Sequence, residues 1–409
     1  MLTSLLLENW KSFGSTDTLR SIVQFEPVTL LVGPNASGKS NVLDALRFLQ
    51  GAALDLPLGD VLRGRWEGQR QTWPAIRGHL AEATHNGAPS FTLQSAWGFA
   101  QASATHQLTV GVGRDAVAEG EALYDAEARW LFDTHAPSLG AQAGPAEGGA
   151  VRVALRRNGK GKPLTKTLSG QRSLLGQVVA LAEPLLATDT VTVAQLVHTA
   201  LREAVFLDIR PEAMRNYRPE GGPLGTSGEN ISPVLAALSK DRLQDVVDWL
   251  SELCAPEIET IDFDRTQLGE VMMFVVERGG RRVSARSMSD GTLRFLGLLV
   301  ALLTCPEGSL VVLEEPDVGL HPSRIRLLAE LFDSIATRRD VQIVATTHSP
   351  GLLAHLSPER LASVVAFARD PASGATICSR LGELPHFETL RDAADLDHLV
   401  STGWVERAL

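Results

Sequence analysis

The sequence predicts an α/β fold of the P-loop nucleotide triphosphatase kind, with a β-rich lobe and a helical insertion. The octapeptide Gly33–Ser40 (GPNASGKS) fits the phosphate-binding pattern G-x-x-x-x-G-K-[ST]. The apolar run at 28–32 predicts a buried strand before it, and residues 41–49 carry apolar side chains at helical spacing after it. Strand, glycine loop and helix together favour a phosphate site over a chance glycine turn.

The chain of 409 residues divides into three predicted parts. Residues 1–165 hold the phosphate-binding loop and a β-rich subdomain, with alternating apolar residues at 90–94 and 106–112. Residues 166–256 show helical periodicity and predict an insertion, and residues 257–409 return to alternating strands and helices. The two outer parts are therefore expected to form the nucleotide-binding lobes.

Composition narrows the class of protein. The net charge of −10 argues against a purely electrostatic DNA binder, so nucleic acid would be contacted through a local patch or a partner. The start of the chain lacks a basic n-region, and the longest apolar run, 295–303, is too short to span a bilayer. Three scattered cysteines have no metal-ligand spacing. A cytoplasmic protein with reduced thiols and no membrane contact is expected.

The glycine loop predicts binding of ATP with Mg²⁺. Its backbone N–H groups and the following helix N-terminus would face the phosphates. Lys39 would reach the β- and γ-phosphates, and the Ser40 hydroxyl would ligate Mg²⁺. The predicted nucleotide-binding residues of this segment are Gly33, Pro34, Asn35, Ala36, Ser37, Gly38, Lys39, Ser40 and Asn41.

A second element has the Walker B layout. Residues 309–316 form an apolar strand that ends in two carboxylates, Glu314 and Glu315. The first is expected to organise Mg²⁺ and the second to polarise the attacking water. Two acids at a solvated strand end are the alternative, which the upstream phosphate loop disfavours.

Two weaker elements flank the Walker B segment. Residues 287–294 place a Ser-Asp-Gly turn at the start of an apolar helix, where a plain N-cap is the alternative. Residues 341–350 form a strand that ends in a polar turn with His348, and a lone histidine is often structural. The order of all these motifs along the chain supports a common role.

That order resembles ABC-type ATPases of the RecF, structural-maintenance-of-chromosomes and overcoming-lysogenization-defect branch, especially stand-alone predicted ATPases with an AAA_21-type domain. The opening at 9–13 (NWKSF), the segments 206–215 and 228–235, and the end at 402–404 also resemble this group.

The resemblance implies a homodimer that sandwiches two ATP molecules. Ser289 and Gly291 of the signature motif would then bind the γ-phosphate of the nucleotide held by the other protomer. His348 would sense the γ-phosphate, and the D-loop at 317–322 would contact the opposite subunit.

The sequence also departs from the family pattern. Ala36 stands where glycine is commoner, which is tolerable if its φ is negative. Glu314 replaces the usual Asp and is one methylene longer. The Q-loop glutamine stays open among Gln69, Gln71 and Gln94. A long coiled coil and room for a toprim nuclease are missing, and Asp395 and Asp397 are interpreted as part of a helix face.

Two basic clusters bear on DNA binding. Residues 152–172 carry seven basic side chains and an Asn158-Gly159 turn signal, and predict a basic hairpin that contacts DNA phosphates or is simply solvated. The second cluster, which precedes the signature motif, comprises Arg278, Arg281, Arg282 and Arg286, and an intersubunit or nucleotide contact is equally expected there.

The function expected from this resemblance is an ATP-hydrolysing switch acting on DNA. The process would be repair or defence against phage and plasmids, with a partner nuclease or other effector. The alternative is a nucleotide-gated scaffold that regulates a partner protein without binding DNA. A transporter ATPase is a third possibility, which the helical middle and the NWKSF opening disfavour.

Overall fold

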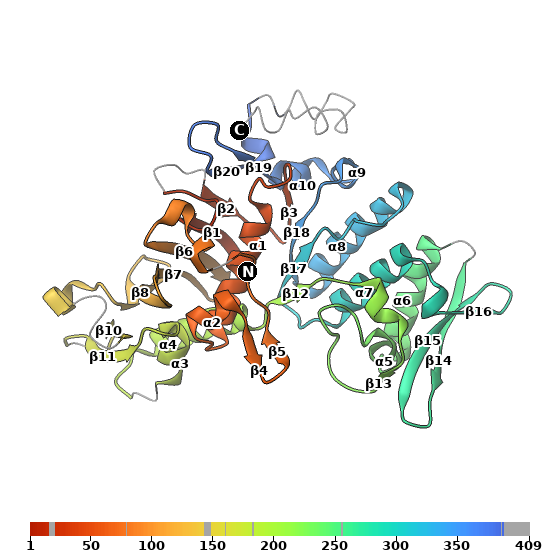
Figure 1. The fold of residues 1–409 in the computed structure, drawn as a ribbon, viewed down its shortest axis with the longest axis horizontal. Helices are drawn as coiled ribbons and strands as arrows, with labels where there is room; N and C mark the ends of the chain where they lie inside the picture. The colour runs from red at the N-terminus through yellow and green to blue at the C-terminus, as the bar shows by residue number, and fades with distance from the viewer. Residues whose placement is uncertain are drawn as a thin grey trace.

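The computed structural model describes residues 1–15, 21–78, 80–142, 149–159, 161–181, 184–254, 257–385 and 387. It is an α/β fold built around a mostly parallel core sheet, with a larger antiparallel sheet on one side and a second, smaller antiparallel sheet on the other (Figure 1). The predicted fold class is therefore confirmed.

The core sheet has six strands in the order β12-β17-β18-β3-β19-β20. All neighbours pair in parallel except the edge strand β20, which runs antiparallel to β19. Because parallel strands end at the same edge of a sheet, side chains that follow β17, β18 and β3 are brought together. The bounds are β12 (Val205–Leu207), β17 (Leu310–Glu314), β18 (Gln342–Thr346), β3 (Val28–Val32), β19 (Val365–Arg369) and β20 (Thr376–Arg380).

The larger antiparallel sheet has eight strands and forms the left side of Figure 1 with helices α1 to α4. In sheet order the strands are β11 (Leu164–Ser169), β10 (Ala150–Leu155), β9 (Trp130–Asp133), β8 (Ala116–Asp125), β7 (Ala102–Val112), β6 (Ser90–Phe99), β1 (Leu2–Glu8) and β2 (Ile22–Gln24). The helices are α1 (Lys39–Ala53), α2 (Leu58–Arg63), α3 (Leu174–Ala180) and α4 (Thr188–Arg202). A separate hairpin pairs β4 (Arg65–Glu67) with β5 (Arg70–Trp73).

The right side of Figure 1 holds the smaller sheet and most of the remaining helices. Its strands are β13 (Arg218–Pro219), β14 (Ile258–Arg265), β15 (Glu270–Glu277) and β16 (Arg281–Ser284). The helices are α5 (Ile231–Ala236), α6 (Lys240–Leu253), α7 (Asp290–Thr304), α8 (Ile325–Arg339), α9 (Pro350–Leu353) and α10 (Pro358–Ser363).

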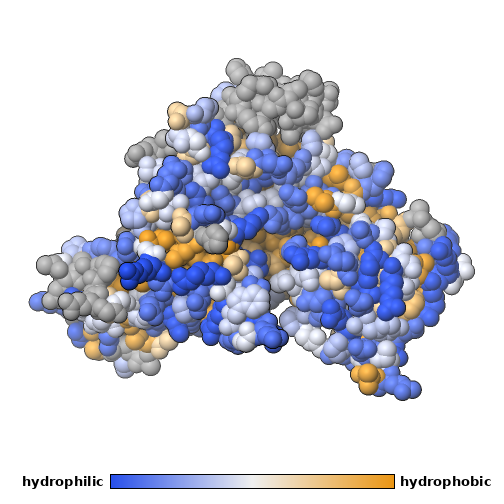
Figure 2. Space-filling view, viewed as in Figure 1, coloured by the Kyte–Doolittle hydropathy of each residue, from blue (hydrophilic) through white to orange (hydrophobic). Residues whose placement is uncertain are grey.

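The core sheet separates two hydrophobic cores. Successive side chains of a strand point to opposite faces, so Leu30 and Val311 pack with α7 and α8, whereas Leu31 and Val312 pack with α1 and the larger sheet. Burial on both faces explains why these strands are continuous apolar runs. The face seen in Figure 2 is largely hydrophilic, with hydrophobic colour concentrated towards the middle of the molecule.

The segment 166–256 is divided between the two cores. Helices α3 and α4 pack in the core beside the larger sheet, whereas α5 and α6 pack in the other core. Between them, β12 joins the core sheet beside β17. The three-part domain division stays a prediction. Within the described part of the chain, no helix is long and apolar enough to cross a membrane.

Candidate active site

Three neighbouring strands of the core sheet bring distant motifs to one edge. The glycine loop follows β3, the Thr346–His348 turn follows β18, and Glu314 and Glu315 lie at the end of β17. Because β18 lies between the other two strands, all three segments meet although more than 300 residues separate the first from the last.

Two glycines allow the phosphate-binding loop to pack against β19 and β20. Gly33 and Gly38 have φ values of 146° and 112°. A Cβ atom at Gly33 would lie 2.3 Å from the Phe367 carbonyl oxygen, and one at Gly38 would lie 2.3 Å from Thr376 Oγ1. Glycine is therefore required at both positions by backbone conformation and by space.

Ala36 has an unfavourable backbone conformation. Its φ is 62°, so the condition under which alanine would be tolerated there is not met. A Cβ in the left-handed region costs about 1–2 kcal/mol. Arg369 Nε donates a hydrogen bond of 2.9 Å to the Ala36 carbonyl and helps to hold this conformation.

Lys39 is buried against its own loop. The residue is 5% exposed, and Nζ donates hydrogen bonds of 2.8 Å to the carbonyl oxygens of Gly33 and Pro34. Burial lowers the pKa of Lys39 from 10.5 to about 8, and the nearby Glu315 carboxylate opposes the shift. A phosphate beside this amine would favour its charged form.

Ser40 and Glu314 fit the requirements of a Mg²⁺ site. Ser40 Oγ donates a hydrogen bond of 3.0 Å to Glu314 Oε1, so the oxygen lone pairs of the hydroxyl remain available to a cation. The longer Glu side chain thus reaches the serine. Among the described residues, no group of three His, Cys, Asp or Glu side chains could hold a metal ion by itself, so water, with phosphate oxygens when a nucleotide is bound, would have to complete the coordination.

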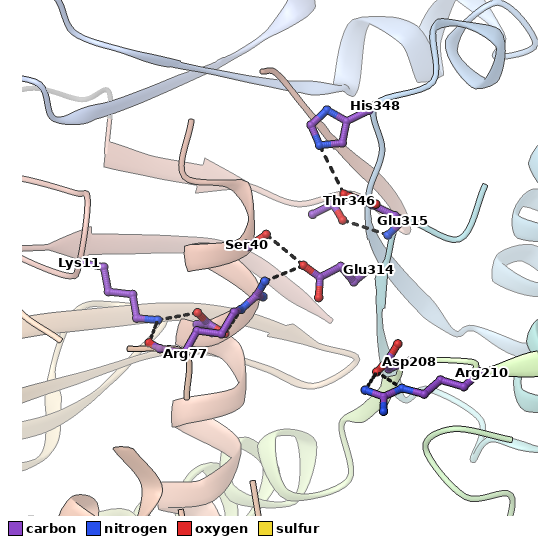
Figure 3. Close-up of polar contacts among 10 residues, drawn as sticks. Lys11, Ser40, Arg77, Asp208, Arg210, Glu314, Glu315, Thr346 and His348 are labelled. Carbon is purple, nitrogen blue, oxygen red and sulfur yellow. Dashed lines mark hydrogen bonds and ion pairs between the residues drawn. The ribbon is translucent and has the colours of Figure 1, made fainter. Parts of the chain in front are cut away.

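Glu315 lies beside His348. Its backbone N–H donates to Thr346 Oγ1 over 3.1 Å, and its Oε1 is 3.4 Å from His348 Nε2 (Figure 3). Glu315 also has a φ of 46°, a strained conformation of the kind found at functional sites. Both side chains are partly exposed and accessible to a water molecule.

A charged network that the sequence interpretation missed surrounds Glu314. Arg77 Nη1 donates a hydrogen bond of 2.8 Å to Glu314 Oε1 (Figure 3). Arg77 Nε donates a hydrogen bond of 3.4 Å to Asp44 Oδ1. Lys11 Nζ contacts the other oxygen of Asp44 at 2.5 Å and the Arg77 carbonyl at 2.7 Å. Burial lowers the pKa of Lys11, and Asp44 opposes that shift. The spacing of these residues in the chain gives no signal of the network, although Lys11 lies in the NWKSF segment.

The signature motif lies apart from this cluster. Ser289 is exposed and caps α7, where its Oγ accepts a hydrogen bond of 3.2 Å from the Thr292 N–H. Arg215 pairs with Asp290 and donates to the Ala285 carbonyl, which fixes the turn. In the described chain, no hydrogen bond or ion pair joins Ser289 to the phosphate-binding loop or to Glu315.

The signature motif packs against the D-loop. A Cβ atom at Gly291 would lie 2.5 Å from the Gly319 carbonyl oxygen. Val318, between the Walker B strand and Gly319, is 47% exposed. The two motifs are therefore in contact, and the D-loop presents an apolar side chain to solvent.

The basic hairpin exists, but its charge is partly neutralised. Strands β10 and β11 pair in antiparallel register, and Arg156 lies 3.4 Å from Asp125 and 3.3 Å from Asp189. Lys160 lies outside the described residues, as do Asp395, Asp397 and 402–404. In the second cluster, Arg278, Arg281 and Arg282 each pair with a carboxylate.

The candidate Q-loop glutamines and the family-like segment at 206–215 lie in different parts of the fold. Gln69 and Gln71 are on the exposed β4–β5 hairpin and Gln94 is on β6, so the Q-loop assignment stays open. The family-like segment at 206–215 begins in β12. Just after this strand, Arg210 Nε donates a hydrogen bond of 2.8 Å to Asp208 Oδ2, at the same sheet edge as Glu314.

Two family models match the chain. The model described as "AAA domain, putative AbiEii toxin, Type IV TA system" matches residues 28–96 and 170–354, more than half of the chain. The model described as "P-loop containing region of AAA domain" matches residues 2–53.

Similar proteins include chromosome partition proteins. A stretch of 51 residues is 57% identical to Chromosome partition protein Smc of Mycolicibacterium paratuberculosis and 55% identical to that of Mycobacterium tuberculosis. In both cases it covers 12% of this chain, and the chain spans only 4% of the length of either relative.

Among solved structures, the SMC head domain from Thermotoga maritima has a TM-score of 0.45 at 14% identity, covering 93% of this chain and 98% of that one. An SmcHead bound to the C-winged helix domain of ScpA has a TM-score of 0.47 at 12% identity, covering 92% and 96% of the two chains.

Proposed function

The chain belongs to the AAA-domain family whose model spans residues 28–96 and 170–354, and from this premise we propose that it binds ATP with Mg²⁺ and hydrolyses it. The observation that carries the proposal is the meeting of the phosphate-binding loop, Glu314, Glu315 and His348 at one sheet edge, with Ser40 bonded to Glu314.

ATP binding is assigned to the loop and its lysine. The N–H groups of the loop and the N-terminus of α1 face the phosphates, and Lys39 neutralises the β- and γ-phosphates. Ser40 and Glu314 would hold Mg²⁺ through the hydroxyl and the carboxylate. The bound ion would supply neutralisation of the phosphate charge.

Hydrolysis is assigned to the two residues at the ends of β17 and β18. The Glu315 carboxylate accepts a proton from the attacking water as general base. His348 donates a hydrogen bond to the γ-phosphate, and its 3.4 Å approach to Glu315 places both groups around one small volume. The strained backbone of Glu315 is consistent with such a fixed orientation.

Assembly of the full site is assigned to a homodimer. Within the described residues, the hydrogen bonds of the Ser289 side chain go to Thr292 and none goes to the phosphate-binding loop, and the exposed Val318 lies in the D-loop that Gly291 contacts. A second copy would place Ser289 on the γ-phosphate and cover Val318. Hydrolysis would then separate the protomers, because the γ-phosphate contacts bridge the interface.

The direct test replaces Glu315 with Gln. The Glu315→Gln variant should bind ATP, lose about 10²- to 10⁴-fold in hydrolysis rate, and accumulate as an ATP-bound dimer. Phosphate release and light scattering measure the two effects. Glu307→Gln, an exposed carboxylate far from the β17 end, is the matched control. Normal hydrolysis by Glu315→Gln would overturn the catalytic assignment.

The process driven by the switch is assigned to DNA repair or to defence against phage and plasmids, in the cytoplasm and with a partner nuclease or effector. The toxin-type description of the family and the basic hairpin at 152–172 support this assignment. The alternative is a nucleotide-gated scaffold that regulates a partner protein without DNA.

Charge reversal separates these two functions. Arg157, Lys162 and Arg172 are the informative positions, because Arg156 is already paired with Asp125 and Asp189. Their combined change to Glu should abolish retention of a DNA duplex at low salt. Arg278→Glu, in the second cluster, is the control. Unchanged DNA binding by the variant would overturn the role of this hairpin. No DNA binding by the unaltered chain would favour the scaffold.

A further inference from the structure

One oxygen of Glu314 receives two hydrogen bonds. Ser40 Oγ donates to Oε1 over 3.0 Å, and Arg77 Nη1 donates to the same atom over 2.8 Å (Figure 3). A carboxylate oxygen has two lone-pair directions, so both are in use at Oε1. A cation or a cation-bound water that approaches this oxygen therefore competes with Arg77.

Arg77 is held in place by a buried ion pair. Asp44 on α1 accepts from Arg77 Nε through Oδ1 and from Lys11 through Oδ2. Lys11 also donates to the backbone carbonyl of Arg77 over 2.7 Å, so both the side chain and the backbone of Arg77 are tied to this pair. The Lys11 and Asp44 side chains are 9% and 8% exposed.

The guanidinium itself contacts Glu314 at the surface. The Arg77 side chain is 53% exposed, and its contact with Glu314 is a solvent-screened ion pair, whereas the Lys11–Asp44 pair beneath it is buried. The network thus combines a buried ion pair with a half-exposed guanidinium.

We infer that Arg77 is a resident counter-cation of Glu314 that competes with a divalent metal for this carboxylate, and that Asp44 and Lys11 are the positioning residues that keep it there. The inference rests on the proposed function, because it takes Glu314 as the metal-site carboxylate. The consequence is that the site prefers a nucleotide-bound divalent ion over a free one. A free ion meets the Glu314 carboxylate already neutralised by Arg77. An ion that arrives with a triphosphate brings further ligands, which favour displacement of Arg77.

The test measures Mn²⁺ binding to the nucleotide-free chain by electron paramagnetic resonance of the free ion. Arg77→Ala should lower the midpoint concentration of Mn²⁺ about three- to fivefold, the size expected when an exposed ion pair no longer competes. Arg77→Lys, which keeps the charge, should bind Mn²⁺ less tightly than Arg77→Ala. Asp44→Asn should also lower the midpoint, because it releases the anchor.

The matched control is Arg63→Ala. Arg63 has a side chain of similar exposure and pairs with Asp115 at 2.7 Å, away from Glu314. It should leave the Mn²⁺ midpoint unchanged. An unchanged or higher midpoint in Arg77→Ala would overturn the inference.

Glu314→Gln distinguishes this failure from failure of the proposed function. If Glu314→Gln abolishes Mn²⁺ binding and Arg77→Ala has no effect, the metal site stands and only the role of Arg77 is wrong. If Glu314→Gln binds Mn²⁺ as the unaltered chain does, the metal site itself is wrong and the inference falls with it.

Discussion

ATP affinity should fall as the pH rises above 8, because Lys39 loses its proton in that range. Burial lowers the pKa of this amine to about 8 in the nucleotide-free protein. Phosphates favour the protonated amine, so the pKa rises when ATP binds. Above pH 8 the Lys39 amine is mostly neutral, so ATP binding must be accompanied by uptake of a proton. Each further pH unit therefore weakens ATP binding.

The size of the effect comes from the protonated fraction of Lys39. With a pKa of about 8, this fraction is about nine-tenths at pH 7 and about one-tenth at pH 9, so the dissociation constant should rise about tenfold between them. Terminal phosphate groups titrate near pH 6, so ATP itself contributes little to the change.

Isothermal titration calorimetry of the Glu315→Gln variant at pH 7, 8 and 9 measures the dissociation constant without turnover. The observed binding enthalpies in two buffers of different ionisation enthalpy should differ by the amount that corresponds to uptake of about half a proton at pH 8. Lys39→Arg is the control, since a guanidinium stays charged and any residual binding should not change with pH. A constant affinity from pH 7 to 9, with no proton uptake, would refute the assignment of the shifted pKa to Lys39.

Three further substitutions test the conformations described above. Ala36→Gly should raise the free energy of unfolding by about 0.5–1 kcal/mol in urea denaturation, because the left-handed strain it removes exceeds the entropy cost of glycine. Gly291→Ala should prevent the ATP-dependent dimer, seen by light scattering, while ATP binding persists, because its Cβ would meet the Gly319 carbonyl at 2.5 Å. Lys11→Met should lower the free energy of unfolding by about 3 kcal/mol, because it leaves the buried Asp44 carboxylate with only the half-exposed Arg77 as a partner. A second change, Asp44→Leu, should restore much of the lost stability.

Each of these changes has a matched control or a contrary outcome. Ala200→Gly, inside α4, should lower the free energy of unfolding by about 1 kcal/mol, opposite in sign to Ala36→Gly. Gly113→Ala, which has open space around its Cβ, should leave dimerisation unchanged. If Lys11→Met is as stable as the unaltered chain, the Lys11–Asp44 pair is not an anchor.

The sequence predicts the elements whose signals are local. Gly33, Gly38 and Lys39 encode the loop through their own spacing, and continuous apolar runs mark the strands because both faces of the core sheet are buried. The carboxylates Glu314 and Glu315 could be placed at a strand end for the same reason. Parallel order then explains why these motifs meet.

Features that depend on tertiary contacts are not encoded in such patterns. The Arg77 contact with Glu314 joins residues 237 positions apart, and neither residue type nor spacing distinguishes Arg77 from other surface arginines. The φ of Ala36 depends on a loop geometry that Arg369 supports from the other end of the chain. The periodicity of 166–256 predicts helices but not which core each helix joins.

The walls of the phosphate-binding loop have a consequence for biosynthesis. Gly38 packs on Thr376, whose hydroxyl donates to the Ser37 carbonyl over 2.8 Å and hydrogen-bonds Ser12 at 2.7 Å. Gln342 binds both backbone groups of Leu2. Contacts of such long sequence separation form only after the ribosome has synthesised both partners. A nascent chain should therefore remain unable to bind nucleotide until Thr376 has emerged, so that a product cut short before this residue should lack nucleotide affinity.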